Sequence, residues 1–149
     1  MRVETPRNGR EELDPYRHTG YLLRRAQQLH VATWTRLVSA DTTSVQYAIL
    51  ALLNRLGAAS QRTLCDEADL DRSTIADILV RMERRGLVER TRDPDDRRRN
   101  AVTLTPAGHE EYARLRPRVN AADAELTGAL SPDERAALRA QLRRMLRSA

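Results

Sequence analysis

The sequence predicts a mainly α-helical fold with a small β-hairpin wing, arranged as a winged helix-turn-helix. Two helical patterns separated by a tight turn lie at residues 60–68 and 72–86, and two strand patterns follow at once, at residues 87–92 and 100–104. Apolar side chains recur every three to four residues in the helical pair, and turn residues bound the short runs of the strand pair. Two short helices, a turn and a hairpin in this order make a winged helix-turn-helix.

The composition is that of one folded chain. Its 149 residues suit a single domain with helical extensions, and 40% hydrophobic with 32% charged residues are typical of a globular protein. No apolar run approaches the ~20 residues that span a bilayer. Residues 1–13 are polar and lack a signal-peptide core, so we expect a flexible leader, no membrane segment and a cytoplasmic protein.

The charge balance favours a polyanionic partner. The net charge is +5, and all 26 basic residues are arginine because the sequence contains no lysine. Nucleic acid is a better match for such a chain than an acidic protein surface.

The first half of the chain predicts four helices. The first covers residues 14–39, and a capped break at residues 41–44 separates it from a second at 45–57, whose apolar side chains on nearly every side predict burial. The third begins at Ser60, and Asp71 is the predicted N-cap of the fourth. The apolar stripe of the fourth helix is Ile75, Ile78, Leu79 and Met82.

Two longer helices are expected after the hairpin. Thr105 and Pro106 are an N-cap and a first helical position, and we expect a kink at Pro117. Residues 131–134 form a capping box for the last helix.

The two ends of the chain are more apolar than a lone winged helix requires. A winged unit at residues 41–105 needs only its own middle portion for a core. We therefore expect the segments 14–40 and 106–149 to pack against a partner.

The segment Leu70 to Gly108 resembles the MarR family of bacterial transcription regulators. In that family a Ser/Thr-Thr helix start leads into R-G-L-V-x-R, a D-x-R wing and L-T-x-x-G. The matching residues occur here in order: Ser73, Thr74, Arg85, Gly86, Leu87, Val88, Arg90, Asp96, Arg97, Arg98, Leu104, Thr105 and Gly108. The resemblance runs from about residue 20 to the C-terminus. It implies that the segments 14–40 and 106–149 are dimerisation helices that join two copies of the chain. The homodimer would bind a pseudo-palindromic double-stranded DNA operator, most often as a repressor.

The resemblance gives a role to the dense charge in DPDDRRRN. Arg98 takes the position of the arginine that family members place in the minor groove, where the negative potential attracts Arg. Asp96 takes the position of the aspartate that orients this arginine, and Arg97 and Arg99 are expected to contact phosphates. A solvated charge run is the alternative.

The fourth helix is then the recognition helix, and its polar face is expected to enter the major groove. The residues expected on that face are Arg72, Ser73, Thr74, Asp77, Arg81 and Arg84. Asp77 either accepts a hydrogen bond from a cytosine amine or holds Arg81 by an ion pair. A salt-bridged surface helix is the alternative for the whole face.

The first helix holds a predicted ligand set of Tyr21, Arg24, His30 and Trp34. Its stretch LLRRAQQLH resembles the first helix of family members that control aromatic-acid catabolism. The resemblance assigns Arg24 to the ligand carboxylate and His30 to an oxygen, while Trp34 would stack on the ring. The set is not one continuous stripe, so a neighbouring element or the second subunit would complete the pocket. Ordinary surface charge and dimer packing are the alternative.

Other hypotheses remain open at this point. An enzyme is disfavoured because no P-loop, H-E-x-x-H, G-x-S-x-G or glycine-rich dinucleotide turn occurs. A winged helix that contacts protein, or a regulator with an acyl-thioester, antibiotic, metal or redox input, would also fit. The single cysteine, Cys65, excludes an internal disulfide and is expected to be a small buried filler; with no Cys/His cluster, no metal or cofactor is expected.

Overall fold

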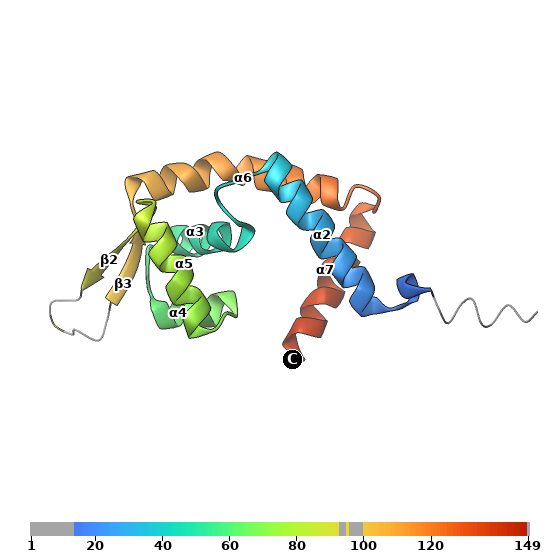
Figure 1. Ribbon diagram of the computed structural model, residues 1–149, viewed down its shortest axis with the longest axis horizontal. Helices are drawn as coiled ribbons and strands as arrows, with labels where there is room; N and C mark the ends of the chain where they lie inside the picture. The colour runs from blue at the N-terminus through green and yellow to red at the C-terminus, as the bar shows by residue number, and fades with distance from the viewer. Residues whose placement is uncertain (1–13, 93–94, 96–99, 149) are drawn as a thin grey trace, which may run out of the picture.

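The computed structural model describes residues 14–92, 95 and 100–148, and the predicted leader at residues 1–13 lies outside this range. A long helix, α6 (Pro106–Leu126), runs along the top of the molecule and joins two parts (Figure 1). The winged part lies at one end, and α2 (Thr19–Leu37) and α7 (Pro132–Arg147) lie at the other. Within the described ranges, no helix has both the length and the apolar character that crossing a membrane requires.

The winged part has the predicted order of helix, helix, helix and hairpin. Its elements are α3 (Ser44–Leu56), β1 (Ala58–Ser60), α4 (Gln61–Ala68), α5 (Arg72–Arg84), β2 (Val88–Arg92) and β3 (Asn100–Leu104). Strands β2 and β3 pair antiparallel, from Val88 opposite Leu104 to Arg92 opposite Asn100. The mainly helical fold with a small β wing is therefore confirmed.

One strand was not predicted from the sequence. Strand β1 pairs antiparallel with β3, with Ala59 opposite Val102, so the hairpin becomes a three-stranded sheet of order β1-β3-β2. A strand of three residues is too short to show alternation. It forms because the free edge of β3 offers hydrogen-bonding groups to the chain that passes beside it.

The first predicted helix begins later than expected. Residues Pro15–Arg17 form a separate 3-10 turn, in which the Asp14 carboxylate accepts a hydrogen bond from the Tyr16 N–H at 3.0 Å. His18 is extended, with φ −96° and ψ 122°, and this conformation breaks the helical ladder before α2 starts at Thr19. The predicted helix start at residue 14 is therefore wrong, because α2 begins at Thr19.

The other helix starts are set by the capping residues that the sequence shows. Asp71 and Thr105 cap α5 and α6, and Ser60 caps α4. Full capping boxes are present at Thr43 and at Ser131, the latter as predicted. Helix α6 continues through Pro117 to Leu126, so the proline does not end it.

The main core lies inside the winged part. Its fully buried residues are Ile49, Leu50, Leu53, Leu64, Ile75, Leu79 and Met82. It is closed by Val88, Val102 and Leu104 from the sheet and by Leu87 just before β2, all of them buried. Cys65 is half-buried and packs against this core, consistent with a space-filling role.

The second core is much smaller and leaves helices uncovered. It consists of Trp34, Val38, Leu115 and Ala122, contributed by α2 with its C-cap and by α6. Helix α7 has no buried residue, and its Leu146 is 68% exposed. In a single chain the α2–α6–α7 end therefore carries apolar surface without a protein neighbour.

Helix α6 is attached to the winged part by close backbone contacts. The Thr105 N–H donates to the Leu87 carbonyl at 3.1 Å, and the Thr105 hydroxyl donates to the Gly86 carbonyl. Gly108, one turn into the helix, passes so close that a Cβ would lie 2.0 Å from the Leu87 oxygen. The glycine of the L-T-x-x-G motif is therefore required by this approach of two backbones.

Gly108→Ala should lower the free energy of unfolding by roughly 1–3 kcal/mol, the usual cost of overpacking. The added methyl would collide with the Leu87 carbonyl, which is backbone and cannot swing away. Urea denaturation measures the loss. Gly20→Ala is the control, since nothing lies within 4 Å of its Cβ position. Equal midpoints for the two variants would contradict the close approach.

Candidate functional site

Helix α5 turns an apolar face to the core and a polar face outward. Ile75, Leu79 and Met82 are fully buried on the inner face. The polar residues predicted on this helix lie toward the outer side: Arg72, Ser73, Asp77, Arg81 and Arg84 are exposed, and Thr74 is half-buried. The helix packs against β2, which places α5 beside the hairpin (Figure 1).

The N-terminus of α5 is held by one carboxylate. Asp71 Oδ1 accepts hydrogen bonds from the Thr74 N–H at 2.7 Å and from the Ser73 hydroxyl at 2.9 Å. The bond from the Thr74 N–H is the main reason why the pKa of the Asp71 carboxyl lies below its usual value. Because Ser73 gives its proton to Asp71, its oxygen is left as an acceptor for an outside donor.

Ion pairs order the charged side chains of this face. Arg81 lies 3.1 Å from the Asp77 carboxylate one turn earlier, as one of the two predicted roles of Asp77 requires. Arg90 on β2 lies 3.5 Å from Glu83 and links the sheet to the helix. For exposed groups such pairs contribute little stability, but they limit the conformations of the arginine side chains.

The wing tip cannot be compared in the same way. Asp96, Arg97, Arg98 and Arg99 lie outside the described residues. The strands on both sides are described, with Arg92 opposite Asn100 as the last pair. In the sequence, the four residues belong to the connection between these two paired strands.

The structure brings together two of the four predicted ligand-binding residues. The His30 and Trp34 rings meet edge to face, with centroids 5.9 Å apart. The Tyr21 ring instead meets the Tyr16 ring, with centroids 5.4 Å apart. Arg24, which lies between Tyr21 and His30 on α2, is exposed. Within one chain, Tyr21 and Arg24 do not line a cavity with the other two.

His30 and Trp34 do line a cavity, which lies between α2 and the start of α3. Its volume is about 160 Å³, and its walls are His30, Val31, Trp34, Thr35, Ser39, Ala40, Thr42, Thr43 and Ser44. A dry cavity of roughly 150 Å³ accommodates a benzene ring, so one six-membered ring fits here.

Trp34 is also a structural residue. It is 8% exposed, packs against Tyr47 at 5.9 Å, and donates its indole N–H to the Thr42 carbonyl at 2.8 Å. Trp34 thus packs inside its own chain, and its ring also forms part of the cavity wall.

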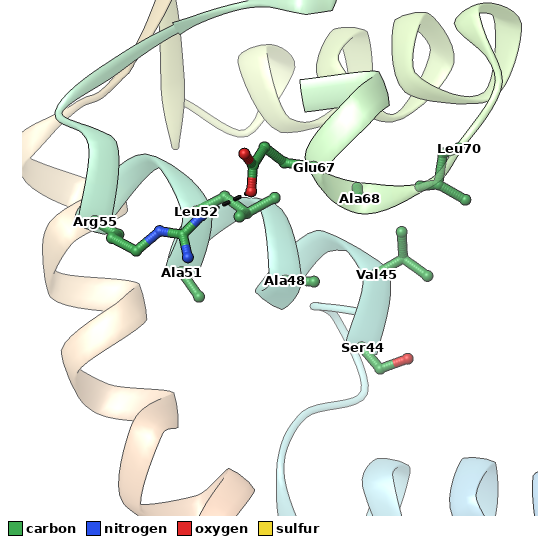
Figure 2. Close-up of a pocket in the computed structure, with 9 residues that line it drawn as sticks. All are labelled: Ser44, Val45, Ala48, Ala51, Leu52, Arg55, Glu67, Ala68 and Leu70. Carbon is green, nitrogen blue, oxygen red and sulfur yellow. Dashed lines mark hydrogen bonds and ion pairs between the residues drawn. The ribbon is translucent and has the colours of Figure 1, made fainter. Parts of the chain in front are cut away.

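A larger hollow lies between α3 and α4 and was not predicted. It measures about 530 Å³, and Figure 2 shows its lining of Ser44, Val45, Ala48, Ala51, Leu52, Arg55, Glu67, Ala68 and Leu70. Its only charged residues, Arg55 and Glu67, neutralise each other at 2.8 Å. Ser44 lines both this hollow and the cavity at Trp34. A space formed where two helices cross leaves no pattern in either sequence.

The sequence also missed a polar cluster around Thr42. Arg85 donates to the Thr42 hydroxyl at 3.1 Å, and that hydroxyl donates to Glu111 at 2.9 Å. Arg114 donates to both Glu111 oxygens and, with help from Thr42, holds the pKa of that carboxyl below its usual value, although partial burial opposes this. In the sequence, Arg85 belongs to the R-G-L-V motif, which gives no sign of its contact with Thr42. Among the residues described, no group of three or more His, Cys, Asp and Glu side chains could hold a metal ion.

Known proteins match both the winged part and the whole length of the chain. A sequence model of the MarR family matches residues 42–99, which cover the winged part. The HTH-type transcriptional repressor NicR of Pseudomonas putida is 33% identical over 148 residues, covering 97% of this chain and 94% of that protein.

Two solved structures share the whole architecture. The PcaV transcriptional regulator of Streptomyces coelicolor, in complex with its natural ligand, is 40% identical with a TM-score of 0.86 and covers 90% of this chain and 95% of its own. BpsR of Bordetella bronchiseptica, whose DNA binding is regulated by 6-hydroxynicotinic acid, is 33% identical with a TM-score of 0.81 and covers 86% and 92%.

Proposed function

The chain belongs to the MarR family of transcriptional regulators, and from this premise we propose that it binds a DNA operator as a homodimer and is released by a small aromatic carboxylate. The observation that carries the DNA-binding part is the set of exposed arginines on α5, a helix that lies beside the hairpin (Figure 1). Arg72, Arg81 and Arg84 suit phosphates and base edges, and a major groove accepts a helix.

Specific recognition in this proposal needs the wing as well as α5. Arg98 would enter the minor groove next to the major groove that holds α5, with Asp96 orienting it and Arg97 and Arg99 on phosphates. The net charge of +5 adds long-range attraction to the duplex.

Arg98→Ala should weaken operator binding by roughly 5- to 150-fold, because a specific arginine contact contributes about 1–3 kcal/mol. Fluorescence anisotropy measures this with the labelled intergenic duplex beside the gene, titrated at several salt concentrations. The control is Arg147→Ala, which removes the same charge from α7, at the far end of the molecule from the hairpin (Figure 1).

Two results would contradict the DNA proposal. Affinity of Arg98→Ala equal to that of the control would remove the wing from the interface. Absence of salt-sensitive binding to this duplex and to a pool of genomic fragments would favour a protein-contacting winged helix, since phosphate contacts make binding salt-dependent.

The uncovered apolar surface supports the dimer. Leu138, Met145 and Leu146 of α7 are 41%, 46% and 68% exposed, and Leu22, Leu23 and Leu29 of α2 are exposed as well. The segments 14–40 and 106–149 would bury these side chains against a second copy, and a two-fold dimer would present two α5 helices to two half-sites.

Leu146→Asp should shift the protein from dimer to monomer, because a carboxylate would enter an apolar interface. Sedimentation equilibrium gives the oligomeric state. Ala140→Asp, which puts the same charge on the opposite side of α7, should remain dimeric. If Leu146→Asp stays dimeric as well, α7 does not form the interface.

The ligand part of the proposal rests on the cavity beside His30 and Trp34. Its volume suits one aromatic ring, and BpsR responds to 6-hydroxynicotinic acid, an aromatic carboxylate of that size. Arg24 does not line the cavity within its own chain, so we assign the carboxylate contact to Arg24 of one subunit at the site of the other. The ligand would favour a dimer whose α5 helices are wrongly spaced for DNA, and the protein would act as a repressor, as NicR is named.

Arg24→Ala should leave operator affinity unchanged and raise the acid concentration for half-release by roughly 10- to 150-fold, since a hydrogen bond to a charged group contributes about 1.5–3 kcal/mol. The anisotropy assay is repeated with benzoate, 4-hydroxybenzoate, cinnamate and 6-hydroxynicotinate. Arg25→Ala is the matched control, because Arg25 is the neighbouring arginine and bonds to Gln28 at 2.8 Å. Equal release of both variants would move the carboxylate site elsewhere.

A further inference from the structure

Thr42 connects four separate parts of the molecule. It is fully buried, its carbonyl accepts the Trp34 indole N–H at 2.8 Å, and its own N–H donates to the Ser39 hydroxyl at 2.9 Å. Its hydroxyl accepts from Arg85 and donates to Glu111 on α6. Every polar atom of one residue is thus committed, so Thr42 cannot shift without changing these contacts.

Arg85 is the contact from the recognition helix. It is the C-cap of α5, and its N–H still donates to the Arg81 carbonyl at 3.2 Å, so it moves with the last turn. Its guanidinium reaches the Asp41 carbonyl at 3.0 Å, the Thr42 hydroxyl at 3.1 Å and Gln46 at 3.4 Å. The planar guanidinium presents its N–H donors in a rigid fork, which suits acceptors at fixed positions. A lysine ammonium is a compact charge and cannot reproduce this geometry.

The loop held by Arg85 is also a wall of the cavity. Ser39, Ala40, Thr42 and Thr43 face the space next to Trp34, and Arg85 grips the same loop from the α5 side. We propose that the loop of residues 39–43 transmits occupancy of the cavity to α5, with Arg85 as the positioning residue. This inference rests on the proposed function and adds the route by which the ligand site acts on the DNA-binding face.

Coupling between two binding sites is reciprocal, so DNA must act on the cavity as strongly as a ligand acts on DNA. Trp34 is the only tryptophan, and its hydrogen bond to Thr42 makes its emission sensitive to the loop. Operator duplex alone, with no acid present, therefore tests the route.

The experiment is a titration of the full-length protein with the operator duplex, followed by Trp34 emission. Wild type should change its emission at saturating DNA, and Arg85→Gln should bind the duplex without that change. Arg90→Gln is the matched control, because Arg90 pairs with Glu83 of α5 at 3.5 Å and not with the loop. An unchanged emission response in Arg85→Gln, or none in wild type, would overturn the proposal.

The acid gives a second measure. In wild type, the acid of the panel that releases DNA changes the operator Kd by a coupling factor, typically about 5- to 150-fold. That factor should fall toward one in Arg85→Gln and recover in part in Arg85→Lys, while calorimetry shows that the acid still binds. A purely structural role of Arg85 would weaken DNA binding with and without acid alike and leave the factor unchanged, which would overturn the route.

A third measure does not depend on DNA or ligand. In a double-mutant cycle on urea unfolding, Trp34→Phe and Arg85→Gln should be non-additive, because both act on Thr42. Additive effects would overturn the link itself. A protein that binds no DNA but shows the non-additivity would instead overturn the proposed function, so the two failures are distinguishable.

Discussion

The Leu87 carbonyl is the contact on which the arrangement of the molecule depends. This oxygen accepts a hydrogen bond from the N–H of Thr105, the N-cap of α6, at 3.1 Å. Gly108 has no side chain, so the helix can approach the Leu87 oxygen closely. The long helix is thereby seated on the chain between α5 and β2. Helix α5, the hairpin and α6 meet at this one junction, so a rotation of α6 would be passed on to both α5 and the hairpin.

The polar face of α5 is ordered before any partner arrives. Asp71 fixes the first turn, Asp77 holds Arg81, and Glu83 holds Arg90 of the adjacent strand. Arginine side chains lose much rotamer freedom when they bind, and pairs that already restrict them reduce this loss. In the proposed complex with DNA, the exposed ion pairs would therefore matter more for binding than for stability, to which such pairs contribute little.

The sequence could predict contacts between near neighbours in the chain, but not contacts that depend on how separate segments fold together. Caps at Ser60, Asp71 and Ser131 are local hydrogen bonds between near neighbours, and the structure has them at those positions. Strand β1 needs β3 as its partner, and the cavity forms only once α2 and the start of α3 fold together. The Thr42 cluster joins chain segments more than 40 residues apart, such as those of Thr42 and Arg85. Likewise, helical spacing alone could not show that Tyr21 turns to Tyr16 while His30 turns to Trp34.

The unequal size of the two cores has a consequence for turnover in the cell. The winged part closes its own core, whereas α7 buries no residue in a lone chain, so little packing holds this helix folded there. In the proposed dimer, pairing would cover α7, so a newly made chain that has not met its copy would be more open to proteases at this helix. Abundance of the regulator would then be sensed through its own lifetime, with unpaired chains removed faster than paired ones.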